Sequence, residues 1–243
     1  MLRALFCEFL GTMLLLATVI GSGILAHKLD QGNIALSVLC VALATGCCLS
    51  AAINALGQIS AHFNPVVTFA SALRREFPWR NVLPYWITQT LGACAGVILA
   101  NMMFELPAVC ISETVRSGYG QLIGEFVATF GLLGVIFGCA RSNAAVIPAV
   151  VPMYVTGAIL FTSSTCFANP AVTISRILTS SLCGIKPDCV FAFIAIQLLA
   201  CFCAVAFFGW LFKKDENAAE DKDARASASA RREHREFAGT SRR

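Results

Sequence analysis

The apolar residues of this chain are gathered into long stretches, and the charged residues fall in short links between them. Four stretches of near 20 residues, interrupted only by Glu8 and Glu125, each predict one membrane-spanning helix. About 20 apolar residues in a helix cross the roughly 30 Å hydrocarbon core of a bilayer. We therefore expect spans over about residues 4–26, 82–104, 121–140 and 189–212.

Two further uncharged stretches have the wrong length for simple spans. Residues 31–73 and 142–175 contain 43 and 34 residues, too many for one span and awkward for two with an exposed turn. In each stretch, an Asn-Pro pair lies among the residues that exceed one span. Because proline favours the first turn of a helix, each stretch is predicted to form a full span, a chain reversal and a short re-entrant half-helix. Irregular backbone at membrane depth is tolerated where it is buried or lines a wet cavity. The half-helices are expected at 64–73 and 169–178, beginning at Asn64-Pro65 and Asn169-Pro170.

The chain also contains an internal duplication. A Glu and a Thr four residues apart, on one helix face, occur at Glu8 and Thr12 and again at Glu125 and Thr129. The pattern Asn-Pro-x-Val-Thr follows each pair. Each copy holds three spans, an odd number, so the copies are inverted and their half-helices enter from opposite faces. We predict an all-α polytopic membrane protein of six transmembrane helices and two half-helices, with repeats over 1–115 and 116–212.

Composition and charge narrow the function classes. Apolar residues make up 57% of the chain and charged residues 13%, against about 25% charged in soluble domains. This balance excludes a soluble enzyme domain and a nucleic-acid binder with a basic face. Of the 32 charged residues, 16 lie in residues 213–243. That segment has too little apolar surface to fold and is predicted to be a disordered cytoplasmic tail.

The basic residues predict the orientation in the membrane. With the N-terminus inside, fourteen Lys and Arg lie on the cytoplasmic side, nine of them in the tail, and four lie outside. The positive-inside rule then places both termini in the cytoplasm. Glu8 interrupts what would be the apolar region of a cleaved signal, so the first stretch is interpreted as a span of a cell-membrane protein.

The two Asn-Pro pairs are the candidate chemistry. A helix N-terminus presents unpaired N–H groups and about half a positive charge, and two such ends facing each other at the midplane repel cations, including hydronium. Asn64 and Asn169 add amide donors that orient a passing oxygen, so neutral hydrogen-bonding solutes pass. The alternative is two ordinary Asn N-caps. No nucleophile–base pair, metal cluster or cofactor motif points to an enzyme, and the 12 cysteines are scattered.

These residues resemble the major intrinsic protein family, the aquaporins and glycerol facilitators, over about residues 1–212. The resemblance rests on the two boxes, the paired Glu-x-x-x-Thr elements and the duplication. The second box reads Asn169-Pro170-Ala171, and the first departs from it with Val66 after Asn64-Pro65. The resemblance implies a homotetramer in the lipid bilayer with one pore in each protomer, and its bacterial members imply the bacterial inner membrane.

The resemblance also implies roles for three polar residues. Glu8 and Glu125 match glutamates that hold the backbone of the half-helix loops; direct contact with solute is the alternative. His62, two residues before the first Asn, lines or braces the cytoplasmic vestibule, or is purely structural.

A selectivity constriction is implied by position relative to the boxes. Its members are Thr45, Gly157, Cys166 and Val172, and Val172 stands where an arginine is usual. All four are small and uncharged, so the constriction is expected to be wide and weakly polar. The alternative is that a neighbour refills the gap, with Phe161, Phe167 and Arg176 as candidates.

The predicted function is a passive channel for water, glycerol-like polyols and metalloid hydroxides such as arsenite. The segment around the second box resembles bacterial members associated with arsenic resistance, and Cys166 would place a thiol at the narrowest point. A water-selective channel is one alternative. A secondary transporter is another, and it would need intramembrane carboxylates facing the substrate, for which only Glu8 and Glu125 are available.

Overall fold

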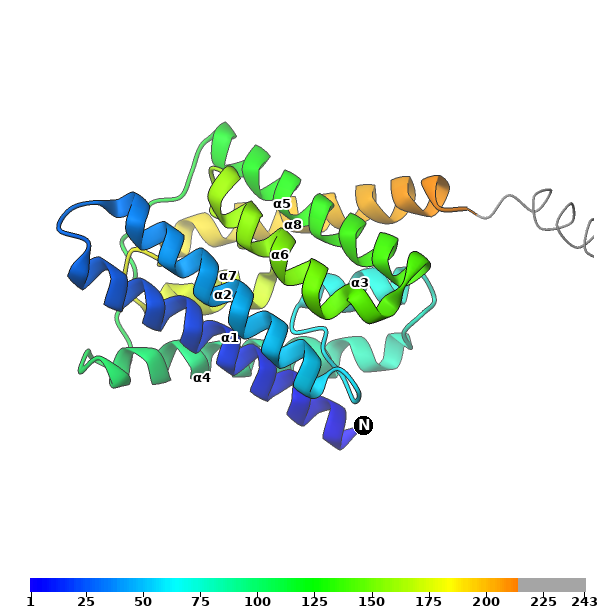
Figure 1. The fold of residues 1–243 in the computed structure, drawn as a ribbon, viewed down its shortest axis with the longest axis horizontal. Coiled ribbons are helices and arrows are strands. Elements are labelled where there is room, and N and C mark those ends of the chain that lie inside the picture. The colour runs from blue at the N-terminus through cyan, green and yellow to red at the C-terminus, as the bar shows by residue number, and fades with distance from the viewer. Residues whose placement is uncertain (214–243) are drawn as a thin grey trace, which may run out of the picture. The chain divides into compact units, whose positions relative to one another are not determined.

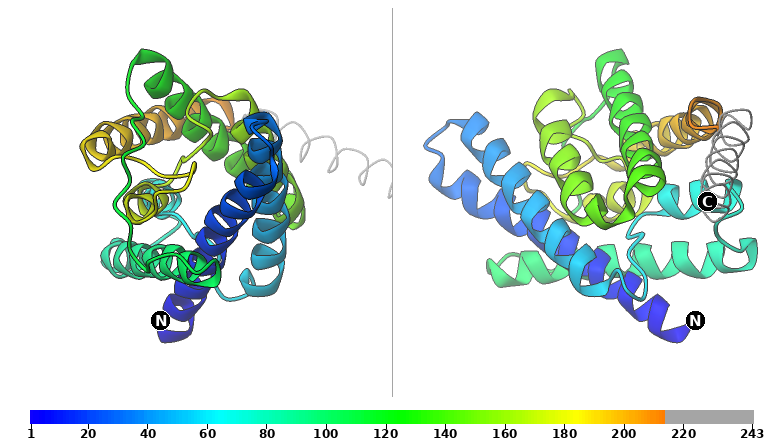
Figure 2. Two further views of the ribbon diagram at one scale, coloured as in Figure 1. Left: turned by 90° about the vertical axis from the view of Figure 1, so that its left-hand side faces the viewer. Right: turned by 45° about the vertical axis from the view of Figure 1, so that its right-hand side comes forward.

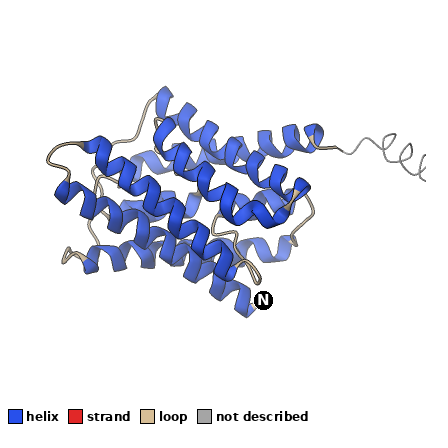
Figure 3. Cartoon of the chain, viewed as in Figure 1, coloured by secondary structure: helices blue, strands red, loops and turns tan. Residues whose placement is uncertain are grey.

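The computed structural model describes residues 1–213, and over these residues the chain is helical with no strands (Figure 3). The predicted tail, residues 213–243, lies outside the described residues except for Lys213. The fold (Figure 1) consists of α1 Leu2–Leu29, α2 Ile34–Leu56, α3 Pro65–Leu73, α4 Val82–Met103, α5 Tyr119–Ser142, α6 Ile147–Phe161, α7 Pro170–Ser175 and α8 Pro187–Leu211. Short 3-10 turns occur at Trp79–Asn81, Ala144–Val146 and Arg176–Leu178.

Six of these helices are long and apolar enough to cross a membrane, counting the 3-10 turns that extend α4 and α6. Their outward faces carry large apolar side chains that are left exposed, among them Phe6, Leu91 and Phe191. A lipid environment accounts for such surfaces, since soluble proteins rarely expose apolar area on this scale. The prediction of an all-α, six-span membrane fold is confirmed.

The two short helices begin at the Asn-Pro pairs. In α3 and α7 the proline occupies the first turn, where its missing N–H costs nothing, and the preceding Asn is the N-cap. The Asn64 side-chain oxygen accepts the N–H of Val66, and that of Asn169 accepts the N–H groups of Ala171 and Val172. Seen end-on, α3 and α7 lie one behind the other between α4 and α8 (Figure 2, left).

Helices α1 and α4 pack at very short range because two glycines of α4 face the α1 backbone. A Cβ atom built on Gly92 would lie 2.4 Å from the Phe9 carbonyl oxygen, and one on Gly96 would lie 2.2 Å from that of Met13. This is the small-residue contact by which helices associate in membranes. The close packing brings Gln89 of α4 within hydrogen-bond distance of Glu8 of α1, and Glu8 accepts a hydrogen bond from the loop before α3.

We expect Gly96→Ala to destabilise the protein, because the added methyl group overlaps backbone that cannot yield. The cost is about 1–3 kcal/mol, typical of an overpacked interior, and would appear as a lower thermal unfolding midpoint in detergent. Gly120→Ala is the matched control, since no atom lies within 4 Å of its built Cβ. Equal midpoints for the two variants would contradict the packing argument.

Candidate functional site

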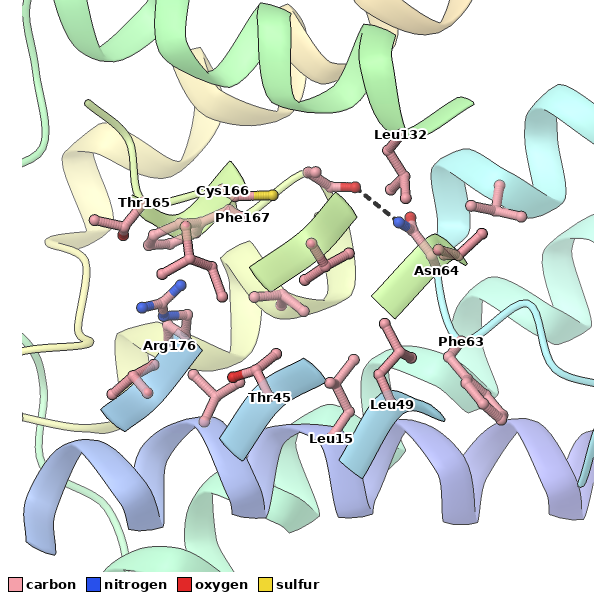
Figure 4. Close-up of a pocket in the computed structure, with 18 of the residues that line it drawn as sticks. Leu15, Thr45, Leu49, Phe63, Asn64, Leu132, Thr165, Cys166, Phe167 and Arg176 are labelled. Carbon is pink, nitrogen blue, oxygen red and sulfur yellow. Dashed lines mark hydrogen bonds between the residues drawn. The ribbon is translucent and has the colours of Figure 1, made fainter. Parts of the chain in front are cut away.

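The two half-helices are joined end to end by reciprocal hydrogen bonds. Asn64 Nδ2 donates to the Ala168 carbonyl oxygen over 2.7 Å (dashed in Figure 4), and Asn169 Nδ2 donates to the Phe63 carbonyl oxygen over 2.8 Å. Each amide therefore uses one of its two N–H groups to hold the opposite loop. The proline and the following residue of each box, Pro65, Val66, Pro170 and Ala171, are buried.

The loop residue before each Asn has a left-handed backbone. Phe63 has φ 50° and Ala168 has φ 46°, a region that costs a non-glycine residue roughly 1–2 kcal/mol. The equivalence of the two positions means that the duplication extends to backbone conformation. In this conformation the carbonyl oxygens of the two residues accept hydrogen bonds from the Asn side chain of the opposite loop. Because the conformation is costly, surrounding side chains must hold it in place.

Glu8 supplies that support in the first repeat. Its Oε1 accepts the His62 N–H at 2.8 Å and the Ser60 hydroxyl, and its Oε2 accepts the Phe63 N–H at 2.7 Å. Gln89 Nε2 donates to the same Oε2 at 2.7 Å. The carboxylate is fully buried, and its lone pairs are directed at the loop.

Glu125 makes the equivalent contacts in the second repeat. Its oxygens accept the Phe167 N–H at 3.2 Å and the Ala168 N–H, and Gln197 Nε2 donates to it at 2.6 Å. It too is fully buried. Both glutamates therefore lie where loop bracing requires them and have no solvent-facing oxygen.

The paired glutamines were missed by the sequence reasoning. Gln89 and Gln197 each bridge the glutamate of their repeat to the threonine of the half-helix, Thr68 at 3.0 Å and Thr173 at 2.9 Å. The sequence does contain a pattern that could have identified the two glutamines. In both repeats an aromatic residue, Tyr85 or Phe193, stands four positions before the glutamine.

A cavity of about 490 Å³ runs beside the joined half-helices. On α2 its lining extends from Ile34 to Ile53, which at 1.5 Å per residue is about 28 Å, close to the thickness of the hydrocarbon core. The lining is mostly aliphatic and, over the described residues, includes neither Asp nor Glu. Its polar members are Thr45, His62, Asn64, Ser71, Arg116, Thr165 and Arg176, and it also contains two cysteines, Cys166 and Cys183.

Of the four constriction residues predicted from position, Thr45, Cys166 and Val172 line this cavity. The Thr45 hydroxyl is buried, faces the cavity (Figure 4) and has no hydrogen-bond partner among the described residues. A solute oxygen passing this level would meet an unpaired donor and acceptor.

Gly157, the fourth predicted constriction residue, is not in the lining of this cavity. The α6 residues in the lining recur every fourth position, at Ile147, Val151, Val155 and Ile159. Gly157 is two residues from Val155 and Ile159, so at 3.6 residues per turn it lies on the other side of the helix. Val155 and Ile159 give this side of the cavity an apolar lining.

One end of the cavity, called here the arginine end, contains two charged side chains, Arg116 and Arg176. Arg176 lies one turn beyond Val172, and its guanidinium carbon is 3.6 Å from the centroid of the Phe167 ring. Two of the three candidates for filling the space beside Val172, Phe167 and Arg176, line the cavity, whereas Phe161 is exposed and outside the lining.

Arg116, from the link between α4 and α5, lies at the same end. Its guanidinium carbon is 4.9 Å from the Phe167 centroid, and its Nε donates to the Gly184 carbonyl at 2.8 Å. Burial, with a smaller contribution from Arg176, lowers the pKa of Arg116 to about 10. The side chain therefore remains protonated at neutral pH. Nothing in the sequence indicated that this link residue reaches the pore.

The other end, called here the histidine end, opens into a second cavity of about 670 Å³. Four residues line both cavities: Ile53, Ala61, His62 and Ile147. His62 Nδ1 lies 3.1 Å from the Thr68 hydroxyl, and its ring packs against Phe77 and Tyr85. His62 is thus both a lining residue and a fixed one. No group of three His, Cys, Asp or Glu side chains within residues 1–213 could hold a metal ion.

Comparison with known proteins identifies relatives over most of the chain. The family described as Major intrinsic protein matches residues 1–166. An aquaglyceroporin, AqpS of Rhizobium meliloti (strain 1021), is 41% identical over 212 residues, covering 87% of this chain and 91% of that protein. A glycerol uptake facilitator protein of Streptococcus pneumoniae (strain ATCC BAA-255 / R6) is 31% identical, over 56% of this chain and 64% of that one.

A solved structure gives the same arrangement of helices. The aquaglyceroporin of Plasmodium falciparum superposes with a TM-score of 0.66 at 20% identity, over 90% of this chain and 98% of that one. At this identity the likeness concerns the fold alone.

Proposed function

Because the chain belongs to the major intrinsic protein family, we propose that its cavity is a passive channel for small neutral solutes. The proposed solutes are water, glycerol-sized polyols and metalloid hydroxides such as arsenite, which is largely the neutral trihydroxide near pH 7. Two relatives are named for glycerol or as aquaglyceroporins, in keeping with a pore wider than one for water alone.

The observation that carries the proposal is the length of the cavity. Its lining follows α2 over about 28 Å and continues into the second cavity at His62. A closed binding pocket would not need to cross the whole hydrocarbon layer. A polyol carries both C–H groups and hydroxyl groups. The aliphatic wall can contact the C–H groups through Leu and Val side chains, and Thr45 and Asn64 can form hydrogen bonds with the hydroxyl groups.

Cation exclusion follows from the same lining. No carboxylate of the described residues faces the cavity, while the N-termini of α3 and α7 direct positive dipole ends at its middle and two arginines lie at one end. A cation would lose its hydration shell without gaining an acceptor. A neutral solute loses only a few hydrogen bonds, and the lining groups replace these.

The contacts of Glu8 and Glu125 favour a channel over a secondary transporter. Coupled transport needs intramembrane groups that bind an ion and release it. Both carboxylates are fully buried and accept hydrogen bonds from the loops. Neither carboxylate lines the cavity. Their role in this proposal is to fix the positions of the two Asn side chains.

The proposed setting is the cell membrane, with both termini in the cytoplasm, the arginine end outside and the histidine end inside. The basic residues of the links and the tail favour this orientation. A homotetramer with one pore per protomer is the proposed assembly, by analogy with the family.

The test is stopped-flow light scattering on proteoliposomes, comparing water and glycerol permeability, followed by arsenite uptake into the same vesicles. We expect glycerol and arsenite to enter faster than into protein-free vesicles, with rates linear in the solute gradient. Water flux alone would support a water-selective channel instead, and saturable uptake driven by an ion gradient would support a transporter.

We expect a mercurial to block the pore at Cys166. This side chain and Cys183 are the cysteines of the cavity lining within the described chain. Cys166 lies across the cavity from Thr45 (Figure 4), and a mercury atom bound there would obstruct the path. Glycerol flux should fall in the wild type and stay unchanged in Cys166→Ser. Cys183→Ser, the control, should remain sensitive; block of Cys166→Ser to the wild-type extent would refute the placement.

A further inference from the structure

The arginine end of the cavity contains two cationic side chains that form no ion pair with any residue of the described chain, 1–213. The ion pairs found over residues 1–213 join His27 to Asp30, Arg74 to Glu76 and Lys186 to Asp188, and none includes Arg116 or Arg176. Buried charges are normally paired or bound to a ligand. Arg176 is buried and Arg116 is partly buried, so two guanidinium groups without an ion-pair partner among the described residues need explanation.

Arg176 is held in place by one edge of its guanidinium. The side chain is 96% buried, and its Nε donates to the Cys183 carbonyl. Among the described residues no acceptor is assigned to its two Nη atoms, and the guanidinium projects into the cavity (Figure 4). Up to four N–H donors are thus directed at the cavity rather than at the protein.

Arg116 is held similarly, by carbonyl groups of a neighbouring loop. Its Nε and Nη2 donate to Gly184 and Leu182 at 2.8 and 3.0 Å. Its Nη1 has only long contacts, 3.4 Å to the Thr165 hydroxyl and 3.5 Å to the Ser164 carbonyl. Both arginines are therefore fixed in position by neutral acceptors, and each retains N–H groups for a ligand.

The nearest carboxylate does not neutralise the pair. Glu125 contributes a long-range attraction to Arg116 and Arg176, but its oxygens accept the Phe167 and Ala168 N–H groups and Gln197. The Phe167 ring lies against both guanidinium groups. An aromatic ring attracts cations but carries no net charge, so it does not neutralise them. The electrostatic repulsion between the two cations is left for a ligand to offset.

We propose that the arginine end binds a small singly charged oxyanion, of the carboxylate or sulfonate type, between Arg116 and Arg176. Two oxygens of such an anion match the forked donors of guanidinium groups. The adjoining wall contains Phe167, Val172 and Leu182, which suit a methyl-sized apolar remainder. The inference goes beyond the proposed function, because binding at this end does not require that anything be conducted.

Methanesulfonate is the probe, because it is fully ionised at neutral pH and does not cross lipid as a neutral acid. Purified full-length protein in detergent is titrated calorimetrically with its sodium salt at constant sodium concentration, with gluconate as a bulky reference anion. We expect saturable binding of methanesulfonate at one site per chain and none of gluconate. The affinity should fall about tenfold or more in Arg116→Gln, which loses a charge-assisted contact.

Lys186→Gln is the matched control, since it removes a cation from a residue that already pairs with Asp188. It should bind as the wild type does. Heat that is linear in methanesulfonate for the wild type, or equal affinity in Arg116→Gln and wild type, overturns the proposal. Should Arg116→Gln fail to fold, the wild-type titration against gluconate decides. Glycerol flux in anion-free buffer is measured separately, so a failure of the channel and a failure of the anion site are distinguishable.

Discussion

Glycerol flux through Val172→Arg is expected to fall about tenfold or more relative to the wild type. Val172 lines the cavity together with Thr45 and Cys166. An arginine there would project into the cavity and approach Arg176, which lies one turn away on the same helix face. A barrier to glycerol raised by about 1.4 kcal/mol slows passage about tenfold, and a bulky cation in the path is expected to add at least that much. Stopped-flow light scattering measures the effect.

Val172→Ile is the control for this substitution, because it enlarges the side chain slightly and adds no charge. It should keep most of the glycerol flux. If Val172→Arg folds and passes glycerol at the wild-type rate, then Val172 does not border the conduction path, and its assignment to the selectivity constriction is wrong.

Replacing either bracing glutamate by leucine is expected to abolish folding of the pore. Glu8 accepts four hydrogen bonds and Glu125 at least three. Each buried donor left unpaired costs about 1–3 kcal/mol, so Glu8→Leu and Glu125→Leu should each lose about 3 kcal/mol or more. The left-handed residues Phe63 and Ala168 would lose the contacts that hold them.

The readout is the fraction of protein that elutes as a single species from detergent, together with its thermal unfolding midpoint. Glu113→Gln, which changes an exposed acid on the α4–α5 link, should behave as the wild type. A normal midpoint in both leucine variants would show that the loops do not depend on these carboxylates.

Much of the fold was predictable because its determinants are local. Charge-free stretches and their lengths separate spans from half-helices, and proline restricts where a helix can begin. The second Asn-Pro pair then shows that the chain is duplicated. These features depend on one segment at a time, so they can be read without knowing which segments come together.

The lining of the pore was less predictable, because it depends on helix phase and on loops. Counting twelve residues back from Asn169 reached Gly157 across a loop in which Thr165, Cys166 and Ala168 all have positive φ. Such a loop does not preserve a helical register. Arg116 comes from an irregular link whose path is set by the carbonyls of Leu182 and Gly184, and these lie far away in the sequence.

The central claim is that the cavity conducts neutral solutes and rejects cations, and one measurement addresses both parts. Proteoliposomes containing a pH-sensitive dye are exposed to a glycerol gradient and, in a second mixing, to a proton gradient. We predict that glycerol permeability rises in proportion to the protein content, while the decay of the proton gradient equals that of protein-free vesicles. Glycerol permeability at the protein-free level, or proton leakage that grows with the protein content, would contradict the account.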